Sequence, residues 1–456
     1  MSEPNTQPPP APTPAAAAAP PKPPVKAPVE NPALRMLGLP KLPKKLPSRN
    51  WMIFWAVTGT ISSAIIYDKR EKNRATAKWR RAVAPLAEEI LPSATQLPRK
   101  LTIYLESPPG DSLRVAQDHF IEYVKPVLSA SGLDWEFVQG RQQGDVRAAV
   151  AEKIRMSRRE TERPDEELPQ TDDTLLAQMR KRMGVPEYQG AKGDIVIGRH
   201  TWKEYMRGLH EGWLGPLDAP TPPAVEVKPA QPETTTPEAS TTDGDATEEK
   251  KEEPKKEEKP SRPPQPIPHN TPEDYSSAVL PAQIPAEFSP STQIPFPHRL
   301  GFRHTFVRLG WFLNRRKLAD DIGREVAAVC FAAAREYRTA DGQYEQQLVL
   351  QHEERDWPKS VWQDEVPEKD EDGNDKPIPV KEKIWTSPIV TDDRIAQRMR
   401  RFEITPEDEA KATKIVVPEE EIEGWIKGSL RSAWRWGAAS LASKPKGPNV
   451  GNLDDE

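Results

Sequence analysis

Cysteine is almost absent from this chain of 456 residues, in which Cys330 is the only one. A single cysteine excludes an intramolecular disulfide framework and a zinc site built from several thiolates. Because Cys330 lies in the apolar run 326–334, we expect a small buried side chain rather than a reactive thiol. The seven histidines are scattered and lack the spacing of metal ligands. We therefore predict no metal-binding residues.

Motifs of catalysis and targeting are missing as well. No P-loop, GxGxxG, GxSxG or HExxH pattern occurs, so we predict no catalytic residues, no cofactor-binding residues and no cofactor. Residues 1–30 contain neither an apolar run nor an arginine, which excludes a signal peptide and an amphipathic transit peptide. We expect the targeting signal to be internal.

The chain also lacks a concentration of positive charge. Its net charge is −5, and Lys and Arg are not gathered in one domain, so nucleic acid is not an expected partner. Proline is abundant instead, with 52 residues, and 30% of the chain is charged. Pro-rich, charged segments cannot bury enough apolar surface to fold. We expect disorder in a Pro/Ala-rich tail at 1–45, a Pro/Glu/Lys-rich linker at 218–297 and a tail at 438–456.

One apolar segment, 51–67, runs for 17 residues without a charge and has basic residues on both sides. This length is at the short end of the roughly 17 to 25 residues that cross a bilayer as a helix. We predict a single transmembrane helix, and a buried core helix is the alternative. Its membrane-anchoring residues would be Trp51, Phe54, Trp55, Ile61, Ile65, Ile66 and Tyr67.

Small residues in this segment offer a surface for a second membrane helix, because Gly59 and Ser63 are four residues apart. The orientation of the segment stays open. Five Lys and Arg residues lie between 35 and 49 and seven between 69 and 81, so the positive-inside rule slightly favours the C-terminal side as the inside.

The segment after the anchor alternates between strand and helix patterns. We predict a juxtamembrane helix at 68–92, which Pro92 ends. Strand patterns then occur at 100–106, 133–138 and 194–197, and helix patterns at 113–129, 144–156 and 202–209. This order is typical of a small parallel sheet with right-handed crossovers. We predict a soluble α/β domain at 100–216.

The C-terminal part, 298–437, is predicted to be mixed α+β and to pack with the α/β domain. A helix pattern covers 316–337, strand patterns cover 346–351 and 383–385, and a last amphipathic helix covers 418–437. Three tryptophans of this last helix are candidates for docking on a partner, with core packing as the alternative: Trp425, Trp434 and Trp436. The expected fold class is thus a single-pass membrane protein with two soluble parts joined by a disordered linker.

The element order of residues 100–215 is similar to the N-terminal half of the diacylglycerol and sphingosine lipid kinases. In that family a Gly-Gly-Asp-Gly-Thr loop follows the third strand, and its backbone amides approach the nucleotide phosphates. The matching stretch here is 198–201, Gly-Arg-His-Thr, which lacks most of the glycines and the aspartate. The resemblance implies a scaffold whose phosphate site has been lost.

Four segments together resemble another family. They are LPSRNWMIFW at 46–55 with YDKREK at 67–72, FLNRRKLADDIGREV at 312–326, DRIAQRMRRF at 393–402 and GWIKGSLRSAWRW at 424–436. These segments are similar to the large fungal subunit of the mitochondrial inner-membrane carrier translocase, the twin-pore import complex. The likeness extends from about residue 30 to residue 437 and spares the linker.

This second resemblance implies a non-enzymatic subunit that supports insertion of multi-spanning carrier proteins into the inner membrane. It implies an N-terminus in the matrix and a C-terminal domain in the intermembrane space. The implied partners are the channel subunit, other membrane subunits, the small chaperone hexamers of the intermembrane space and the lipid bilayer. Two alternatives remain open: a membrane-tethered lipid or nucleotide enzyme of lipid-kinase-like fold, and an assembly factor for an inner-membrane protease.

Overall fold

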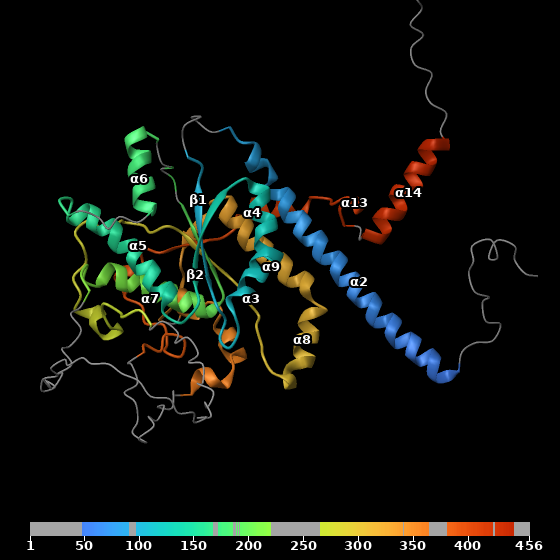
Figure 1. Ribbon diagram of the computed structural model, residues 1–456, viewed down its shortest axis with the longest axis horizontal. Helices are drawn as coiled ribbons and strands as arrows, with labels where there is room; N and C mark the ends of the chain where they lie inside the picture. The colour runs from blue at the N-terminus through green and yellow to red at the C-terminus, as the bar shows by residue number, and fades with distance from the viewer. Residues whose placement is uncertain are drawn as a thin grey trace, which may run out of the picture. The chain divides into compact units, whose positions relative to one another are not determined.

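A computed structural model provides the structure of this chain, and Figure 1 shows its course. It describes residues 48–90, 97–166, 172–185, 192–219, 265–340, 342–363, 381–422 and 425–441, together with Tyr188 and Gly190. By its internal contacts the chain divides into two units, one ending at Ile61 and the other beginning at Ser62. The predicted tail at 1–45 and most of the tail at 438–456 lie outside the described residues.

A six-stranded sheet forms the centre of the second unit, in the order β2-β1-β3-β4-β8-β5. Pairing is parallel from β2 to β8, and only the edge strand β5 is antiparallel. In register, Ile103 lies between Phe137 and Ile195. The strands are β1 (Lys100–Glu106), β2 (Asp134–Gly140), β3 (Asp194–Ile197), β4 (Ser291–Ile294), β5 (Ala334–Glu336) and β8 (Arg400–Phe402).

Side chains of β1 alternate between two apolar layers, as the pleat of a strand requires. Leu101, Ile103 and Leu105 belong to one core with α3 (Leu113–His119), the π-helical turn η2 (Phe120–Val124), α4 (Lys125–Ser131) and α9 (Arg315–Cys330). Tyr104 belongs to the other core, with α5 (Asp145–Glu162) and α7 (Arg199–Leu214). Helices therefore cover both faces of the sheet (Figure 1).

Glycines allow α5 and α7 to cross closely. A Cβ on Gly208 would lie 2.6 Å from the carbonyl oxygen of Arg147, and one on Gly212 would lie 2.8 Å from Cβ of Ile154. Every residue of α7 is buried as a result. Because this helix carries Arg199, Lys203, Glu204, Arg207 and Glu211, its burial brings many charges into the interior.

The anchor segment and the juxtamembrane segment form one helix, α2 (Arg49–Val83), followed by the 3-10 turn η1 (Ala84–Glu88). The helix ends before Pro85, earlier than the predicted end at residue 92. Trp79 lies almost completely buried against α9, where its indole N–H donates to Asp320 at 2.7 Å. Among the described helices, none has an apolar stretch long enough to cross a membrane.

The expected linker at 218–297 is wrong from residue 265 onward. Residues 265–297 contain the 3-10 turn η3 (Pro272–Ser276) and β4, which lies in the middle of the sheet. The strand was missed because its first three residues are Ser, Thr and Gln, yet all are buried. Tyr337 bonds Ser291 and the side-chain nitrogen of Gln293, while Glu325 accepts from Thr292, so each of the three polar side chains of the strand has a partner inside the protein.

The predicted strands at 346–351 and 383–385 are also wrong. The first is α10 (Glu345–Leu348) followed by the 3-10 turn η5 (Gln351–Asp356), and the second is a turn. The predicted helix at 316–337 ends at Cys330, because Ala332 adopts a positive φ of 56° and the chain then enters β5. Strands β4, β5 and β8 join the sheet of residues 100–216, so the two predicted parts share one core.

The remaining elements are short and lie mainly in the C-terminal part. They are α6 (Asp172–Met183), η4 (Phe302–His304), α8 (Thr305–Phe312), β6 (Thr339–Ala340), β7 (Gln343–Tyr344), η6 (Lys359–Trp362), α11 (Asp393–Ala396), α12 (Pro406–Thr413), α13 (Glu419–Ile422) and α14 (Trp425–Leu441). The predicted last helix, 418–437, thus corresponds to the two helices α13 and α14.

Candidate functional site

The first place to look for a site in a parallel sheet is the edge where its strands end and its helices begin. Here β1 ends at Glu106, β2 at Gly140 and β3 at Ile197, directly before Gly198. Gly198 has a φ of 87°, which only glycine adopts readily with the extended ψ found here, and α7 begins at the next residue. The backbone N–H groups of α7 and α5 at this edge could each bind an anion.

An internal carboxylate occupies the N-terminus of α7. Glu353 accepts the backbone N–H of Arg199 at 2.9 Å and that of Phe296 at 2.6 Å. Burial raises the pKa of Glu353 to about 7, although both hydrogen bonds oppose the shift. In the lipid kinases this loop faces phosphate, so the chain places its own side chain where the resemblance would place the ligand.

The N-terminus of α5 is occupied in the same way. One carboxylate oxygen of Glu204 accepts the backbone N–H of Gly144 at 2.6 Å, and the other accepts those of Val146 and Arg147 at 3.1 and 3.2 Å. Glu106 is also fully buried, and its pKa is raised well above the usual value by burial and by the adjacent Glu204. Burial raises the pKa of Glu204 as well, but a hydrogen bond with Glu106, the backbone N–H groups and the Arg147 guanidinium oppose that shift. We therefore assign the proton of the pair to Glu106 and the charge to Glu204.

Arginines of α5 and α7 fill the rest of this edge. Arg147 and Arg155 both pair with Glu211 inside the protein. Arg207 bonds Glu382 at 2.7 Å and the side chain of Asn270 at 2.8 Å. The bonds of Arg207 tie Asn270 and Glu382 to α7, and the buried arginines are engaged by carboxylates of the protein itself.

The buried histidines are not suited to proton transfer. Burial lowers the pKa of His119, His200 and His210 to about 4, so each is neutral at cellular pH. His200 bonds the carbonyl oxygen of Glu106 at 3.2 Å, and His210 bonds that of Met206 at 2.7 Å. Both rings act as fixed hydrogen-bonding groups.

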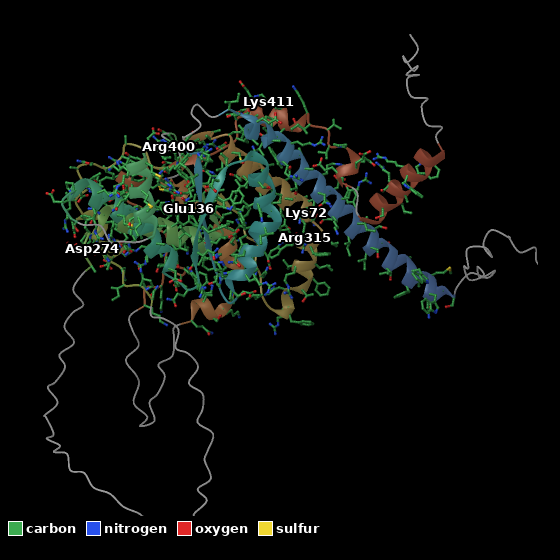
Figure 2. The ribbon with its side chains drawn as sticks, turned by 45° about the horizontal axis from the view of Figure 1, so that its top comes forward. Lys72, Glu136, Asp274, Arg315, Arg400 and Lys411 are labelled. Atoms are coloured by element: carbon green, nitrogen blue, oxygen red, sulfur yellow. The ribbon has the colours of Figure 1, made fainter. Side chains whose placement is uncertain are left out.

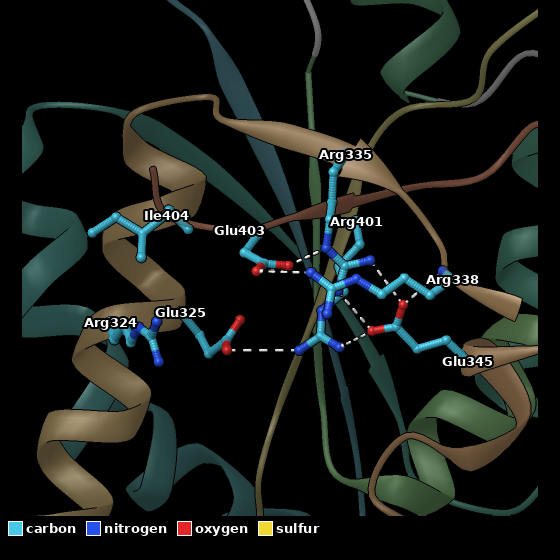
Figure 3. A pocket seen from close by; sticks show the side chains of 9 residues that line it. Arg324, Glu325, Arg335, Arg338, Glu345, Arg401, Glu403 and Ile404 are labelled. Atoms are coloured by element: carbon cyan, nitrogen blue, oxygen red, sulfur yellow. Dashed lines mark hydrogen bonds and ion pairs between the residues drawn. The ribbon is translucent and has the colours of Figure 1, made fainter. Parts of the chain in front are cut away.

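A charged cavity of about 290 Å³ lies between α9 and the β5–β8 edge (Figure 3). Arg335 and Arg401 both bond Glu345, at 2.8 and 2.6 Å, and Arg335 also pairs with Glu403. Burial alone would raise the pKa of Glu345, but the hydrogen bonds from arginine outweigh it and bring the pKa to about 2. Arg335, Arg338 and Arg401 pair with glutamates of the cavity, while Arg324 pairs with Glu409 outside it, so these ion pairs hold the edge strands together.

The residues predicted for the anchor are largely exposed to solvent. Trp51 and Trp55 stack with ring centroids 6.4 Å apart, and Phe54 meets both rings edge to face at 5.6 and 5.8 Å. Ile61, Ile66 and Tyr67 are exposed, and Ile65 is half-buried. A Cβ added at Gly59 would have no atom within 4 Å, and Ser63 is exposed, so this strip is open to a partner helix.

Of the three tryptophans predicted for docking, two can be placed. Trp434 and Trp436 of α14 are both more than three-quarters exposed, as a docking surface requires and as core packing does not. The side chain of Trp425 lies outside the described residues.

One exposed apolar element was missed by sequence reasoning. The short helix α8 has no buried residue, although it contains Phe306, Leu309, Trp311 and Phe312. Phe302, in the preceding turn, is 92% exposed and Phe306 is 84% exposed. The signal was available, because 302, 306 and 309 follow the spacing of one helical face.

Comparison with known proteins identifies the family. Residues 31–402 match the model of the inner membrane protein import complex subunit Tim54. The chain belongs to the Tim54 family. A subunit tim54 of the mitochondrial import inner membrane translocase from Neurospora crassa is 55% identical over 91% of this chain and 90% of its own length. The subunits of the same name from Aspergillus oryzae and Saccharomyces cerevisiae are 42% and 28% identical, over 92% and 84% of this chain and 99% and 96% of their own lengths.

The suspected resemblance to the large subunit of the inner-membrane translocase is thereby confirmed. The Tim54 match includes α2, α8, α9 and the six strands, whereas α12, α13 and α14 follow its end at residue 402. Neither the family description nor the relatives' names refer to a lipid or nucleotide enzyme, so that alternative gains no support.

Proposed function

We propose that this chain is a subunit of the mitochondrial inner-membrane protein import translocase. The observation that carries the proposal is membership of the Tim54 family, whose members from several fungi bear that name. We propose further that the chain is non-enzymatic and supports insertion of multi-spanning carriers. The internal carboxylates Glu204 and Glu353 favour a binding platform, because they occupy the two helix N-termini that a phosphate-bearing substrate would need.

The proposed arrangement has the apolar segment 51–67 of α2 as a single membrane anchor. The N-terminus would then lie in the matrix and the sheet domain in the intermembrane space. Exposed aromatic side chains at Trp51, Phe54 and Trp55 and exposed aliphatic ones at Ile61 and Ile66 support a lipid or helix environment for this segment. Its proposed neighbours are the channel subunit and other membrane subunits, while the small chaperone hexamers would meet the domain.

Import into mitochondria depleted of this chain tests the function. Carrier insertion should fail before import of presequence-bearing matrix proteins declines, and re-expression of the chain should restore it. Equal loss of both classes would contradict a carrier-specific role. Purified protein should show no micromolar ATP binding and no lipid turnover. Either activity would support the enzyme alternative instead.

Protease digestion tests the arrangement separately, with a tag after Glu456. The tag should be protected in intact mitochondria and lost once the outer membrane is opened. Survival of the tag in mitoplasts, with loss only in detergent, would place the domain in the matrix. That result would overturn the proposed topology and leave the family assignment intact.

A further inference from the structure

An exposed apolar surface lies at the start of the C-terminal part. We call it the α8 surface and define it by the exposed apolar side chains Phe302, Phe306 and Leu309. Their spacing places them on one side of η4 and α8. Exposed cations of the same two elements, Arg303 and Arg308, have no ion pair among the described residues, and neither have Lys69 of α2 and Lys317 of α9.

The α8 surface is tied to the point where α2 leaves its apolar segment. The backbone N–H of Arg316, just beyond α8, donates to the buried carboxylate of Asp68 at 3.3 Å. The Arg316 guanidinium also lies over the ring of Tyr67, 5.3 Å from its centroid. Figure 2 shows Lys72 and Arg315 close to each other, and both pair with Glu122. These contacts fix the start of α9, which follows α8 after Leu313 and Asn314, beside the last predicted anchor residue, Tyr67.

We propose that the α8 surface lies on the membrane and binds a bilayer containing anionic lipid. The inference rests on the proposed anchor, because a membrane boundary at Tyr67 would bring α8 to the headgroup level. Exposed phenylalanines next to unpaired Arg and Lys side chains are typical of interfacial helices, in which the rings enter the acyl boundary and the cations meet phosphate. An acidic protein surface would pair with the same cations, so the proximity to the proposed anchor decides for the bilayer, and the experiment below distinguishes the two occupants.

Site-specific fluorescence on the full-length chain in lipid vesicles tests the proposal. An environment-sensitive dye is attached at Phe306→Cys, and a matched probe at Val416→Cys, which is also apolar and 83% exposed. The carbonyl oxygen of Val416 accepts a hydrogen bond from Arg81. Arg81 comes 13 residues after Asp68 and therefore lies about 20 Å from it along α2. The natural Cys330 is buried and its thiol pKa is raised to about 11 by burial, so it labels slowly.

In vesicles of phosphatidylcholine with phosphatidylglycerol, the Phe306 probe should shift to the blue and be quenched by lipids that carry a quencher near the headgroup. The Val416 probe should do neither. Arg303→Gln should weaken the partition of the Phe306 probe into the membrane about fivefold, and high salt should weaken it too. Vesicles of phosphatidylcholine alone should give a smaller shift.

Flotation of the vesicles separates this proposal from the anchor. If the chain floats with the vesicles and the Phe306 probe stays in water, the α8 proposal is overturned while the anchor stands. If the chain does not float, both fail. A shift that occurs only in native mitochondrial membranes, and not in lipid vesicles, would overturn the lipid proposal in favour of a protein partner.

Discussion

Two neighbouring buried glutamates should respond in opposite ways to the same conservative change. Glu204→Gln should destabilise the protein strongly, because Glu204 is the charged cap of α5. Glu106→Gln should change stability by less than about 1 kcal/mol, because Glu106 is already neutral and an amide has nearly the same shape. Charge state, and not burial, decides the difference, since both side chains are fully buried.

The magnitude follows from how the carboxylate oxygens are used. One oxygen of Glu204 accepts the backbone N–H of Gly144, and the other accepts those of Val146 and Arg147. A glutamine has a single carbonyl oxygen, so at least one backbone N–H must face an NH₂ group without a partner, which costs about 1 to 3 kcal/mol. Loss of negative charge at the helix N-terminus adds up to about 2 kcal/mol. We expect a total of about 3 kcal/mol.

Thermal unfolding of the two purified variants and the unchanged chain, in one detergent at pH 7, measures the effect. A loss of 3 kcal/mol corresponds to a fall in Tm of roughly 6 to 12 °C for domains of this size class. Glu106→Gln is the matched control for burial and side-chain length. Equal falls for both variants, or a larger fall for Glu106→Gln, would refute the assignment of charge within the pair.

Three further predictions concern other positions. Glu353→Gln should flatten the pH dependence of the free energy of unfolding. Because the pKa of Glu353 is raised to about 7, the free energy of unfolding of the unchanged chain should fall by roughly 3 kcal/mol as the pH rises from 4.5 to 7. Urea unfolding at several pH values measures this fall. Gly198→Ala should lower Tm by several degrees, because its φ of 87° strains any other residue, whereas Gly310→Ala, in open space on α8, should not. Gly323→Ala should collide with the Trp79 ring and speed tryptic cleavage at Arg80; an unchanged rate would contradict this packing.

The strands of residues 100–197 could be predicted because their pattern is local. Apolar and β-branched residues dominate β1 and β3, and turn residues such as Gly110 mark their ends. Strand β4 could not, because its polar residues are stable in the sheet only through Tyr337 and Glu325, which lie more than 30 residues further along. A pattern read within one segment contains no information about such partners.

The same distinction applies to the candidate site. The sequence shows that residues 198–201 lack the glycines of a phosphate loop, and the loss of such a loop stays an interpretation of the lipid-kinase resemblance. The occupant of the N-terminus of α7 could not be predicted, because Glu353 reaches Arg199 across 154 residues of chain. The spacing of 302, 306 and 309 shows one apolar face of α8, but it does not show that this face is exposed, since an aromatic-rich helix is more often part of a core.

The packing of α2 on α9 attaches the helix that contains the proposed membrane anchor to the sheet domain. Trp79 is almost completely buried, bonds Asp320 and rests on Gly323, where no side chain intervenes. Nearer the apolar segment, Asp68 is held by Arg316. These two attachments, 11 residues and thus about 16 Å apart along one helix, fix the position and the direction of residues 62–83 of α2 on the sheet domain. Any tilt of this part of α2 must therefore move the domain with it, so a partner helix that packs at Ser63 would also set where the domain meets its substrates.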